Sequence, residues 1–268
     1  MLDRNVDKYD VDKYIHSAFA DVIFQLGAKW VLNVGLKADI VDLNVKYNVN
    51  RGATKGKSKI DELFVLPSLN LKYTLNDAHS LRLGMSKTYT LPQSKEISPF
   101  RYVGVNFRSQ GNPNLKPSEN YNVDLKWDFY MTPGELLSIT GFYKHVADPI
   151  SRIEIASAGG YLSYENIANS ATIAGLELEV RKNVFSRTTG LNGDESNKLS
   201  LGFNGSYIYS DANVKLAGKH SELEGAAPFI ANLDVSHNIG KGDRSFTNSL
   251  VLSYFSDRIY TIGTQGYQ

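Results

Sequence analysis

The sequence predicts an all-β protein, an antiparallel up-and-down sheet of about ten strands of the transmembrane β-barrel type. Apolar residues recur at every second position through most of the chain, which is the period of a β-strand. Tight turns alternate with long polar loops, as in outer-membrane barrels. One alternating run covers about 20 residues, whereas ordinary strands have about five or six.

The composition excludes several classes of protein. The 268 residues carry a formal net charge of only +1, which gives no bulk attraction to nucleic acid. The chain has no cysteine, which excludes a disulfide scaffold, a thiolate zinc site and a cysteine nucleophile. No run of 18 or more apolar residues is present, so no transmembrane helix is predicted. The 16 tyrosines and 12 phenylalanines favour strands, in which aromatic residues are enriched.

The clearest strand begins just after Pro117, since Pro113 and Pro117 exclude regular structure before it. One face carries apolar side chains, those of Tyr121, Val123, Leu125, Trp127 and Phe129. The opposite face carries Asn122, Asp124, Lys126 and Asp128. In a soluble sandwich the apolar face would pack on a second sheet, whereas in a membrane barrel it would contact lipid.

The N-terminal part of the chain is predicted to contain an irregular entry segment and three strands. Residues 1–16 are polar and form the entry segment, and the partial barrel domain spans residues 17–268. Strands are predicted over residues 18–26, 32–49 and 69–75, with a turn at Gly27 and a polar loop at 50–59. The alternation slips by one position at Val41, which predicts a β-bulge there.

The rest of the chain continues the alternation of strands with turns and loops. Further strands are predicted over residues 81–91, 121–131, 137–155, 176–181, 199–209, 229–239 and 246–254. Tight turns are predicted at 76–79, 132–134 and 240–243, and longer connections at 92–117, 156–164, 183–197 and 210–227. The connection at 183–197 does not fit the alternation, because a tight turn is expected at that point.

Two groups of residues are predicted to lie on opposite faces of the sheet. Charges of both signs are expected to face the lumen: Lys72, Arg82, Asp124, Lys126, Asp128, Glu177, Glu179 and Arg181. A solvated sheet face would give the same pattern. Aromatic residues beside the tight turns, Trp30, Trp127, Phe129 and Tyr130, fit a membrane girdle or a sandwich core.

Several segments resemble the barrel domain of TonB-dependent outer-membrane receptors, in the style of Bacteroidota-type bacteria. The segment Gly111–Glu119 resembles the family's G-N-P-x-L-K-P-E passage, with Ser118 in the place of the usual glutamate. The segment Tyr164–Glu179 is similar to the family's Y-x-N-x-x-x-A-x-x-x-G-x-E-x-E passage. Residues 66–73 and 77–83 look like paired family strands. The resemblance covers nearly the whole chain from about Ser17 onward.

The resemblance implies a 22-stranded barrel in the outer membrane of a Gram-negative bacterium, plugged by an N-terminal domain, that imports a scarce ligand with energy from TonB. No leader, plug, TonB-box or closing aromatic-ended strand is visible, so the chain is expected to be a middle-to-late fragment of such a barrel. The implied partners are outer-membrane lipid, the plug domain and TonB through flanking sequence, a surface lipoprotein and a small ligand. The ligand is an iron chelate, cobalamin, an oligosaccharide or a peptide.

Two other functions stay open at this stage. The chain could form a non-transporting surface-binding β-sheet protein, lectin-like or adhesive, or a passive diffusion barrel. An enzyme is not predicted, because no catalytic constellation and no G-x-S-x-G element is present. The five histidines lack ligand spacing, so neither a metal site nor a cofactor is predicted.

Binding chemistry is expected in the long loops. The candidate ligand-binding residues are Phe100, Arg101, Tyr102, Phe107 and Arg108 in one loop and Tyr161 and Tyr164 in another. Aromatic rings beside guanidinium groups stack on a sugar ring or hold an anionic chelate. The same residues would also serve to pack loop against loop or to form an outer girdle.

Overall fold

The computed structural model describes residues 7–49, 52–105, 107–155, 161–189, 195–215 and 218–263, and these residues form two sheets. The larger sheet is eleven-stranded and antiparallel throughout. Its path is β1 (Lys8–Leu26), β2 (Trp30–Val49), β3 (Thr54–Thr74), β4 (His79–Thr90), β7 (Ser118–Thr132), β8 (Glu135–Ala147), β11 (Ser170–Thr189), β12 (Glu195–Val214), β14 (Phe229–Lys241) and β15 (Arg244–Phe255). A short strand, β13 (Lys219–Ser221), pairs with β12 beside this path. The predicted up-and-down section of about ten strands is confirmed.

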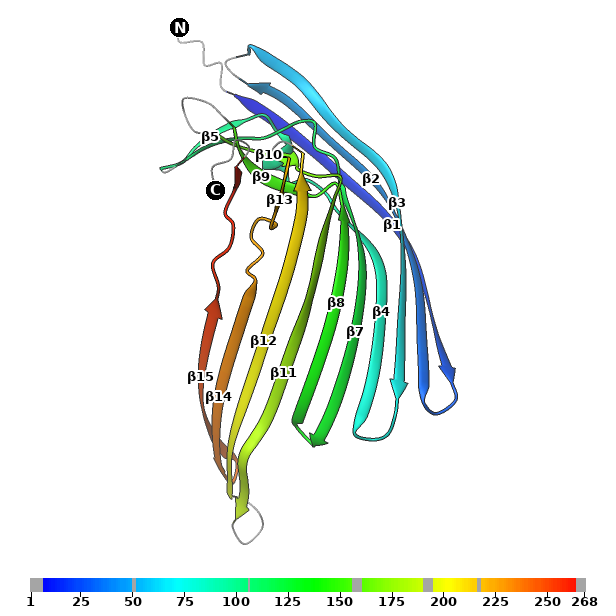
Figure 1. Cartoon of the computed structure of the whole chain (residues 1–268), viewed down its shortest axis with the longest axis vertical. Coiled ribbons are helices and arrows are strands. Elements are labelled where there is room, and N and C mark those ends of the chain that lie inside the picture. The colour runs from blue at the N-terminus through cyan, green and yellow to red at the C-terminus, as the bar shows by residue number, and fades with distance from the viewer. Residues whose placement is uncertain are drawn as a thin grey trace.

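The long strands form a curved wall with two different ends, as Figure 1 shows. The tight turns after β1, β3, β7 and β14 lie together at one end, the turn end. A second, five-stranded sheet crosses the other end, the loop end. Its order is β16 (Ile262–Gly263), β9 (Ile150–Ile155), β10 (Tyr161–Asn166), β6 (Arg108–Gln110) and β5 (Arg101–Val103). A single turn of helix, α1 (Ser94–Ile97), precedes β5.

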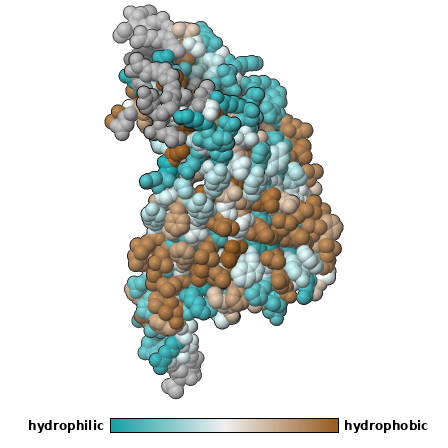
Figure 2. Space-filling view, viewed as in Figure 1, coloured by the Kyte–Doolittle hydropathy of each residue, from teal (hydrophilic) through white to brown (hydrophobic). Residues whose placement is uncertain are grey.

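The outer face of the wall, the face that carries Val123 and Leu125, is apolar across its lower half. Its large side chains are solvent-accessible, since 55% of Leu125, 60% of Leu176 and 64% of Phe246 is exposed. Figure 2 shows hydrophobic side chains in a belt across the molecule, with hydrophilic ones above it. Within the described residues no second sheet covers this belt, which is the arrangement of a lipid-facing barrel wall rather than of a sandwich.

The belt ends in β2 at Val41, where the alternation of apolar residues shifts by one position. Up to Ile40 the apolar side chains lie on the outer face, whereas Val41, Leu43 and Val45 lie on the inner face and are buried. The pairing of β2 with β1 and β3 continues through this point without a register shift, so the predicted bulge at Val41 is wrong. The slip instead shows where a new inner core begins, built from Leu43, Val45, Ile60 and Ile97.

Several predicted connections are strands. Residues 8–16, expected to be irregular, belong to β1, and residues 54–59, expected to be a loop, belong to β3. The predicted strand 137–155 is interrupted at Asp148, which has a φ of 48°, and its second half becomes β9 of the other sheet. Residues 161–164 of the predicted connection at 156–164 belong to β10. Within the predicted connection at 210–227, residues 210–214 belong to β12 and residues 219–221 form β13. Residues 1–6 and 156–160 lie outside the described residues.

The connection predicted at 183–197 is mostly strand. β11 continues to Thr189 and β12 begins at Glu195, and this hairpin extends past the neighbouring turns in Figure 1. A register shift between Asn183 and Phe185 leaves Val184 as a bulge. Strands therefore occupy most of the connection that did not fit the alternation. No helix in the described part of the chain has the length and apolar character needed to cross a membrane.

Candidate functional site

Gly111 fixes the base of the long loop between β4 and β7. A Cβ at this position would lie 1.9 Å from the carbonyl oxygen of Ser98 and 2.7 Å from that of Lys95. Only glycine allows the backbone to approach α1 this closely. The next residue, Asn112, donates its backbone N–H to Glu96 O at 2.6 Å. The Gly-Asn pair of the family-like segment therefore fastens the loop to α1.

Two asparagines join this loop to the β9–β10 hairpin. Asn112 Nδ2 donates to the carbonyl oxygen of Tyr164 at 3.0 Å. Asn166 Oδ1 accepts the N–H of Lys116 at 2.9 Å, and Asn166 Nδ2 donates to the carbonyl oxygen of Lys116 at 3.1 Å. The two segments that resemble family passages are thus in direct contact, although about 50 positions separate them. Their contact allows β6 and β10 to pair in parallel.

A pocket of about 410 Å³ lies between these loops. Its lining is Tyr9, Lys95, Ser98, Phe100, Tyr102, Phe107, Ser109, Arg152, Leu162, Tyr164 and Tyr260. Among the predicted ligand-binding residues, Phe100, Tyr102, Phe107 and Tyr164 line it.

The other predicted residues form a cluster beside the pocket, around the ring of Tyr161. The guanidinium carbons of Arg101 and Arg108 each lie 5.7 Å from the centre of that ring. Arg108 Nη1 also donates to the Tyr161 hydroxyl at 3.4 Å. The seven predicted residues therefore meet in one region, but these three pack on one another rather than line the pocket.

Sequence reasoning missed the polar groups of the pocket. Arg152 lies with its guanidinium carbon 4.6 Å from the centre of the Tyr260 ring, and its Nη2 is 3.3 Å from Glu224 Oε1. Ser98 is 1% exposed, and its Oγ makes no hydrogen bond within the described residues. Arg152 stands in an alternating segment that reads as ordinary strand, and Tyr260 follows the last predicted strand. No pattern in the sequence near either residue could have predicted that Arg152 and Tyr260 would be in contact.

The pocket combines aromatic walls with two cationic side chains. Glu224 also accepts the backbone N–H of Arg152 at 2.5 Å, so this arginine is held from two sides. A guanidinium stacked on a ring keeps donors free at its edge for a carboxylate or phenolate oxygen. Lys95 adds a second cation to the lining. In the described part of the chain, no cluster of three or more histidine, aspartate or glutamate residues is placed to hold a metal ion.

The eight charged residues predicted to face the lumen share the inner face. Lys72, Arg82 and Lys126 are direct cross-strand neighbours, and Glu177 lies in the same row beyond Thr140. Asp124 lies one row nearer the loop end, and Asp128, Glu179 and Arg181 lie nearer the turn end.

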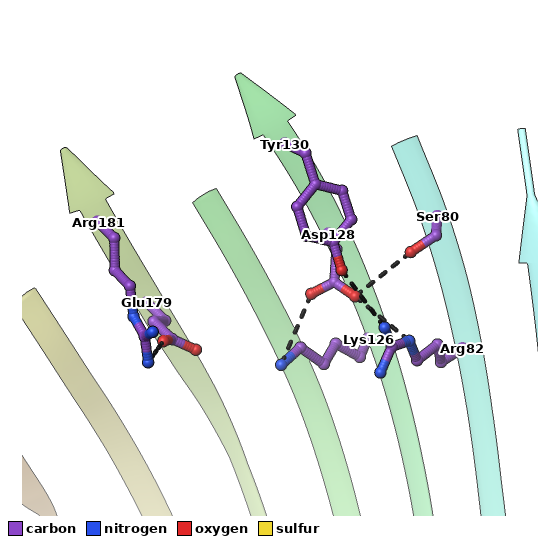
Figure 3. A network of polar contacts seen from close by, with 7 residues as sticks. All are labelled: Ser80, Arg82, Lys126, Asp128, Tyr130, Glu179 and Arg181. Carbon is purple, nitrogen blue, oxygen red and sulfur yellow. Dashed lines mark hydrogen bonds and ion pairs between the residues drawn. The ribbon is translucent and has the colours of Figure 1, made fainter. Parts of the chain in front are cut away.

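Asp128 is the centre of a network on this face, which Figure 3 shows. Its side chain is 2% exposed and lies 3.4 Å from Arg82 Nε and 3.6 Å from Lys126 Nζ. Ser80 Oγ donates to Asp128 Oδ2 at 3.4 Å. Arg82 Nη2 donates to the hydroxyl of Tyr130 at 3.4 Å, so Tyr130 belongs to the inner face and not to the predicted girdle. Glu179 and Arg181 pair with each other at 2.8 Å.

The remaining girdle residues lie on the outer face near the turn end. Trp30 stacks on Tyr73 with 4.1 Å between ring centres. His79 stacks on Phe129 at 4.5 Å and on Trp127 at 5.7 Å. Aromatic rings at this level fit the membrane–water boundary.

A family model described as TonB dependent receptor-like, beta-barrel, matches residues 3–267. The chain belongs to this family. Membership agrees with the curved antiparallel wall, the apolar outer belt and the polar inner face. The family is one of receptors and transporters of the Gram-negative outer membrane. No curated protein matches the sequence.

Two solved structures show the same fold. The ferric yersiniabactin uptake receptor FyuA from Yersinia pestis matches with a TM-score of 0.64 and 16% identity, over 93% of this chain and 35% of that chain. The copper transporter OprC matches with a TM-score of 0.64 and 16% identity, over 93% of this chain and 36% of that chain. The TonB-dependent receptor barrel of this chain therefore spans about a third of the length of these structures.

Proposed function

We propose that this chain forms the ligand-recognising section of an outer-membrane importer that depends on TonB. The observation that carries the proposal is the pocket at the loop end, where aromatic rings and Arg152 meet the hydroxyl of Ser98, which has no hydrogen-bond partner among the described residues. A buried hydroxyl without a partner is unfavourable unless a ligand or water satisfies it. The family membership supports the transport part of the proposal.

The pocket chemistry favours a small anion that contains a planar group. Lys95 and Arg152 line the pocket, and Arg101 and Arg108 lie beside it, whereas Glu224 is already paired with Arg152. Phe100, Tyr102 and Tyr260 offer faces for stacking. Among the ligands that the sequence left open, an anionic metal chelate fits this set better than a neutral oligosaccharide does. The metal in such a chelate is cargo.

The proposed importer needs partners beyond the described residues. A plug domain would fill the lumen and contact the charged inner face around Asp128, and TonB would supply the energy. A surface lipoprotein that delivers the ligand stays a prediction. A passive diffusion barrel would instead admit ligand without TonB, and a lectin-like surface protein would bind sugar without importing it.

The test is direct binding to the receptor that contains this chain, measured by isothermal titration calorimetry. The probes are a ferric catecholate chelate, cobalamin and a maltooligosaccharide. We expect the chelate to bind, and Arg152→Gln to weaken its affinity at least tenfold, because one charge-assisted hydrogen bond contributes about 1.5–3 kcal/mol. The control is Arg187→Gln, an exposed arginine of β11 near the turn end.

Three results would contradict the proposal. One is equal chelate affinity in the Arg152 and Arg187 variants. Another is tight binding of the neutral oligosaccharide that does not depend on Arg152. The third is uptake of the chelate that continues unchanged in cells without TonB, which would indicate passive diffusion.

A further inference from the structure

The outer belt contains a hollow of about 500 Å³ across β7, β8, β11 and β12. Its lining consists of Val123, Leu125, Gly141, Phe142, Tyr143, Ala174, Gly175, Leu176, Tyr207 and Tyr209. None of these residues is charged. The hollow is distinct from the loop-end pocket, with which it shares no residue.

Two small residues create the hollow. In one row across the strands, Gly141 stands between Leu125 and Leu176. In the next row toward the loop end, Ala174 stands between Tyr143 and Tyr209. The larger neighbours project outward and are between 45% and 60% exposed, so they form walls around the two small positions.

The fold does not require glycine at position 141. Gly141 is not among the glycines with positive φ, and a Cβ there would meet only Leu176 Cδ2, at 3.5 Å, which is ordinary contact. Gly175, on the adjacent strand, differs, because its Cβ would lie 2.4 Å from the carbonyl oxygen of Tyr207. Packing therefore explains Gly175, whereas Gly141 leaves open space on a surface that could have been filled.

The position of the hollow identifies its occupant. It continues the apolar belt, whose neighbours in an outer membrane are lipid chains. The tyrosines beside it, Tyr143, Tyr207 and Tyr209, are the residue type that sits at the level of lipid headgroups and ester groups. A second copy of the chain would need a matching surface of roughly 800 Å² on each partner, which is much larger than this hollow. A polypeptide would also need partners for its backbone, and the hollow offers none but tyrosine hydroxyls.

We propose that the hollow between Gly141 and Ala174 holds one fatty-acyl chain of an outer-membrane lipid. The chain contacts Leu125 and Leu176, and the tyrosines face the polar end of the same lipid. A lipid held in this way stays with the barrel when the surrounding, freely exchanging lipids are removed. The proposal rests on the outer-membrane placement of the barrel and not on the loop-end pocket.

Native mass spectrometry of the detergent-solubilised receptor tests the proposal. Delipidated protein is titrated with dipalmitoyl phosphatidylethanolamine, and the fraction that carries one lipid is measured. The variant Ala174→Leu fills the hollow, and Ala38→Leu makes the same change on the same outer face, in β2, outside the hollow. Gly141→Leu fills the hollow from its other end. Heat-modifiable migration on a denaturing gel confirms that each variant is folded.

We expect wild type and Ala38→Leu to retain one lipid, and both hollow variants to lose at least four-fifths of that adduct. Chelate affinity at the loop-end pocket should be unchanged in Ala174→Leu, so the two proposals fail separately. Equal lipid retention in all four proteins would overturn the inference. So would a dimer of the wild type that Ala174→Leu dissociates, because the hollow would then be an interface between copies.

Discussion

The side-chain amide of Asn166 pairs with both backbone polar groups of Lys116. It accepts the Lys116 N–H at 2.9 Å and donates to the Lys116 carbonyl oxygen at 3.1 Å. The same amide donates to the carbonyl oxygen of Asp148 at 2.7 Å. One side chain therefore closes a junction between the long loop, β8 and β10, immediately beside the candidate pocket. Because an amide carries donors and an acceptor in one plane, no other small side chain could satisfy all three backbone groups.

Replacement of Asn166 by alanine should loosen the loop end and leave the strands of the belt intact. Each lost hydrogen bond costs about 1 kcal/mol, so we expect a loss of roughly 2–3 kcal/mol. Limited proteolysis should then cut between residues 150 and 170 much faster than in wild type. The matched control is Asn120→Ala, which removes a single hydrogen bond to Thr90 Oγ1 at 3.2 Å. If both variants are cut at the same rate, the junction at Asn166 does not hold the loops together.

Gly111→Ala should disrupt the pocket from its base. The added Cβ would overlap the carbonyl oxygen of Ser98, so either α1 or the segment after β6 must move. Overpacking of this kind costs about 1–3 kcal/mol, and we expect the upper end of that range because the obstacle is backbone. Ligand affinity should fall at least tenfold, measured by the same calorimetry as for Arg152→Gln. Gly141→Ala, whose Cβ meets only Leu176 Cδ2, should leave affinity and stability nearly unchanged.

Alternation along the chain was enough to predict the belt, because a period of two depends only on which face meets lipid. The residues from Tyr121 to Phe129 lie as predicted. Where alternation changed face, at Val41, the pattern alone could not separate a bulge from a strand that leaves the membrane. The prediction for Tyr130 was wrong for a related reason. Its position beside a turn suggested an aromatic girdle. In the alternation of the strand, however, Tyr130 shares the inner face with Asp128, next to Arg82.

The site was less predictable, because it depends on contacts between distant segments. Phe100, Tyr102, Phe107 and Tyr164 could be proposed from the sequence, since they stand in predicted loops and the first three lie close to two arginines along the chain. Tyr9 lies in β1 of the larger sheet, Arg152 lies in β9 of the second sheet, and Tyr260 follows β15, so only the tertiary fold brings the three together. Ser98 could not be singled out at all, because a sequence does not show that its hydroxyl is buried with no hydrogen-bond partner in the described part of the chain.

Asp128→Asn should destabilise the wall by leaving Arg82 and Lys126 as adjacent cations. The two are direct cross-strand neighbours, and Asp128 is the acid closest to both. The loss of a buried partner costs about 3–5 kcal/mol, but Arg82 and Lys126 are partly exposed, so we expect about 2 kcal/mol. Urea unfolding of the barrel in lipid vesicles measures this loss in the free energy of unfolding. The double variant with Lys126→Met should recover most of the loss, and failure to recover would show that the charge of Lys126 is not the cause.

The pair of Glu195 and Lys241 should make the protruding hairpin sensitive to acid. Glu195 Oε1 lies 2.8 Å from Lys241 Nζ, at the turn end, where the hairpin of β11 and β12 extends past the neighbouring turns (Figure 1). The hydrogen bond and charge of Lys241 hold the pKa of the Glu195 carboxyl below its ordinary value. A lowered carboxyl pKa stabilises the folded state fully above the unfolded pKa of about 4.3, and this contribution is lost as the pH falls through the folded pKa.

Lys241→Met should therefore raise the Glu195 pKa toward its ordinary value, observed by carbon NMR titration of the carboxyl group. Protease sensitivity of the hairpin should increase in this variant at pH 7 and match wild type at pH 3. Lys198→Met, which removes a neighbouring charge on β12, should change neither quantity. A difference between Lys241→Met and wild type that persists at pH 3 would show that packing of the lysine stem, rather than its charge, supports the hairpin.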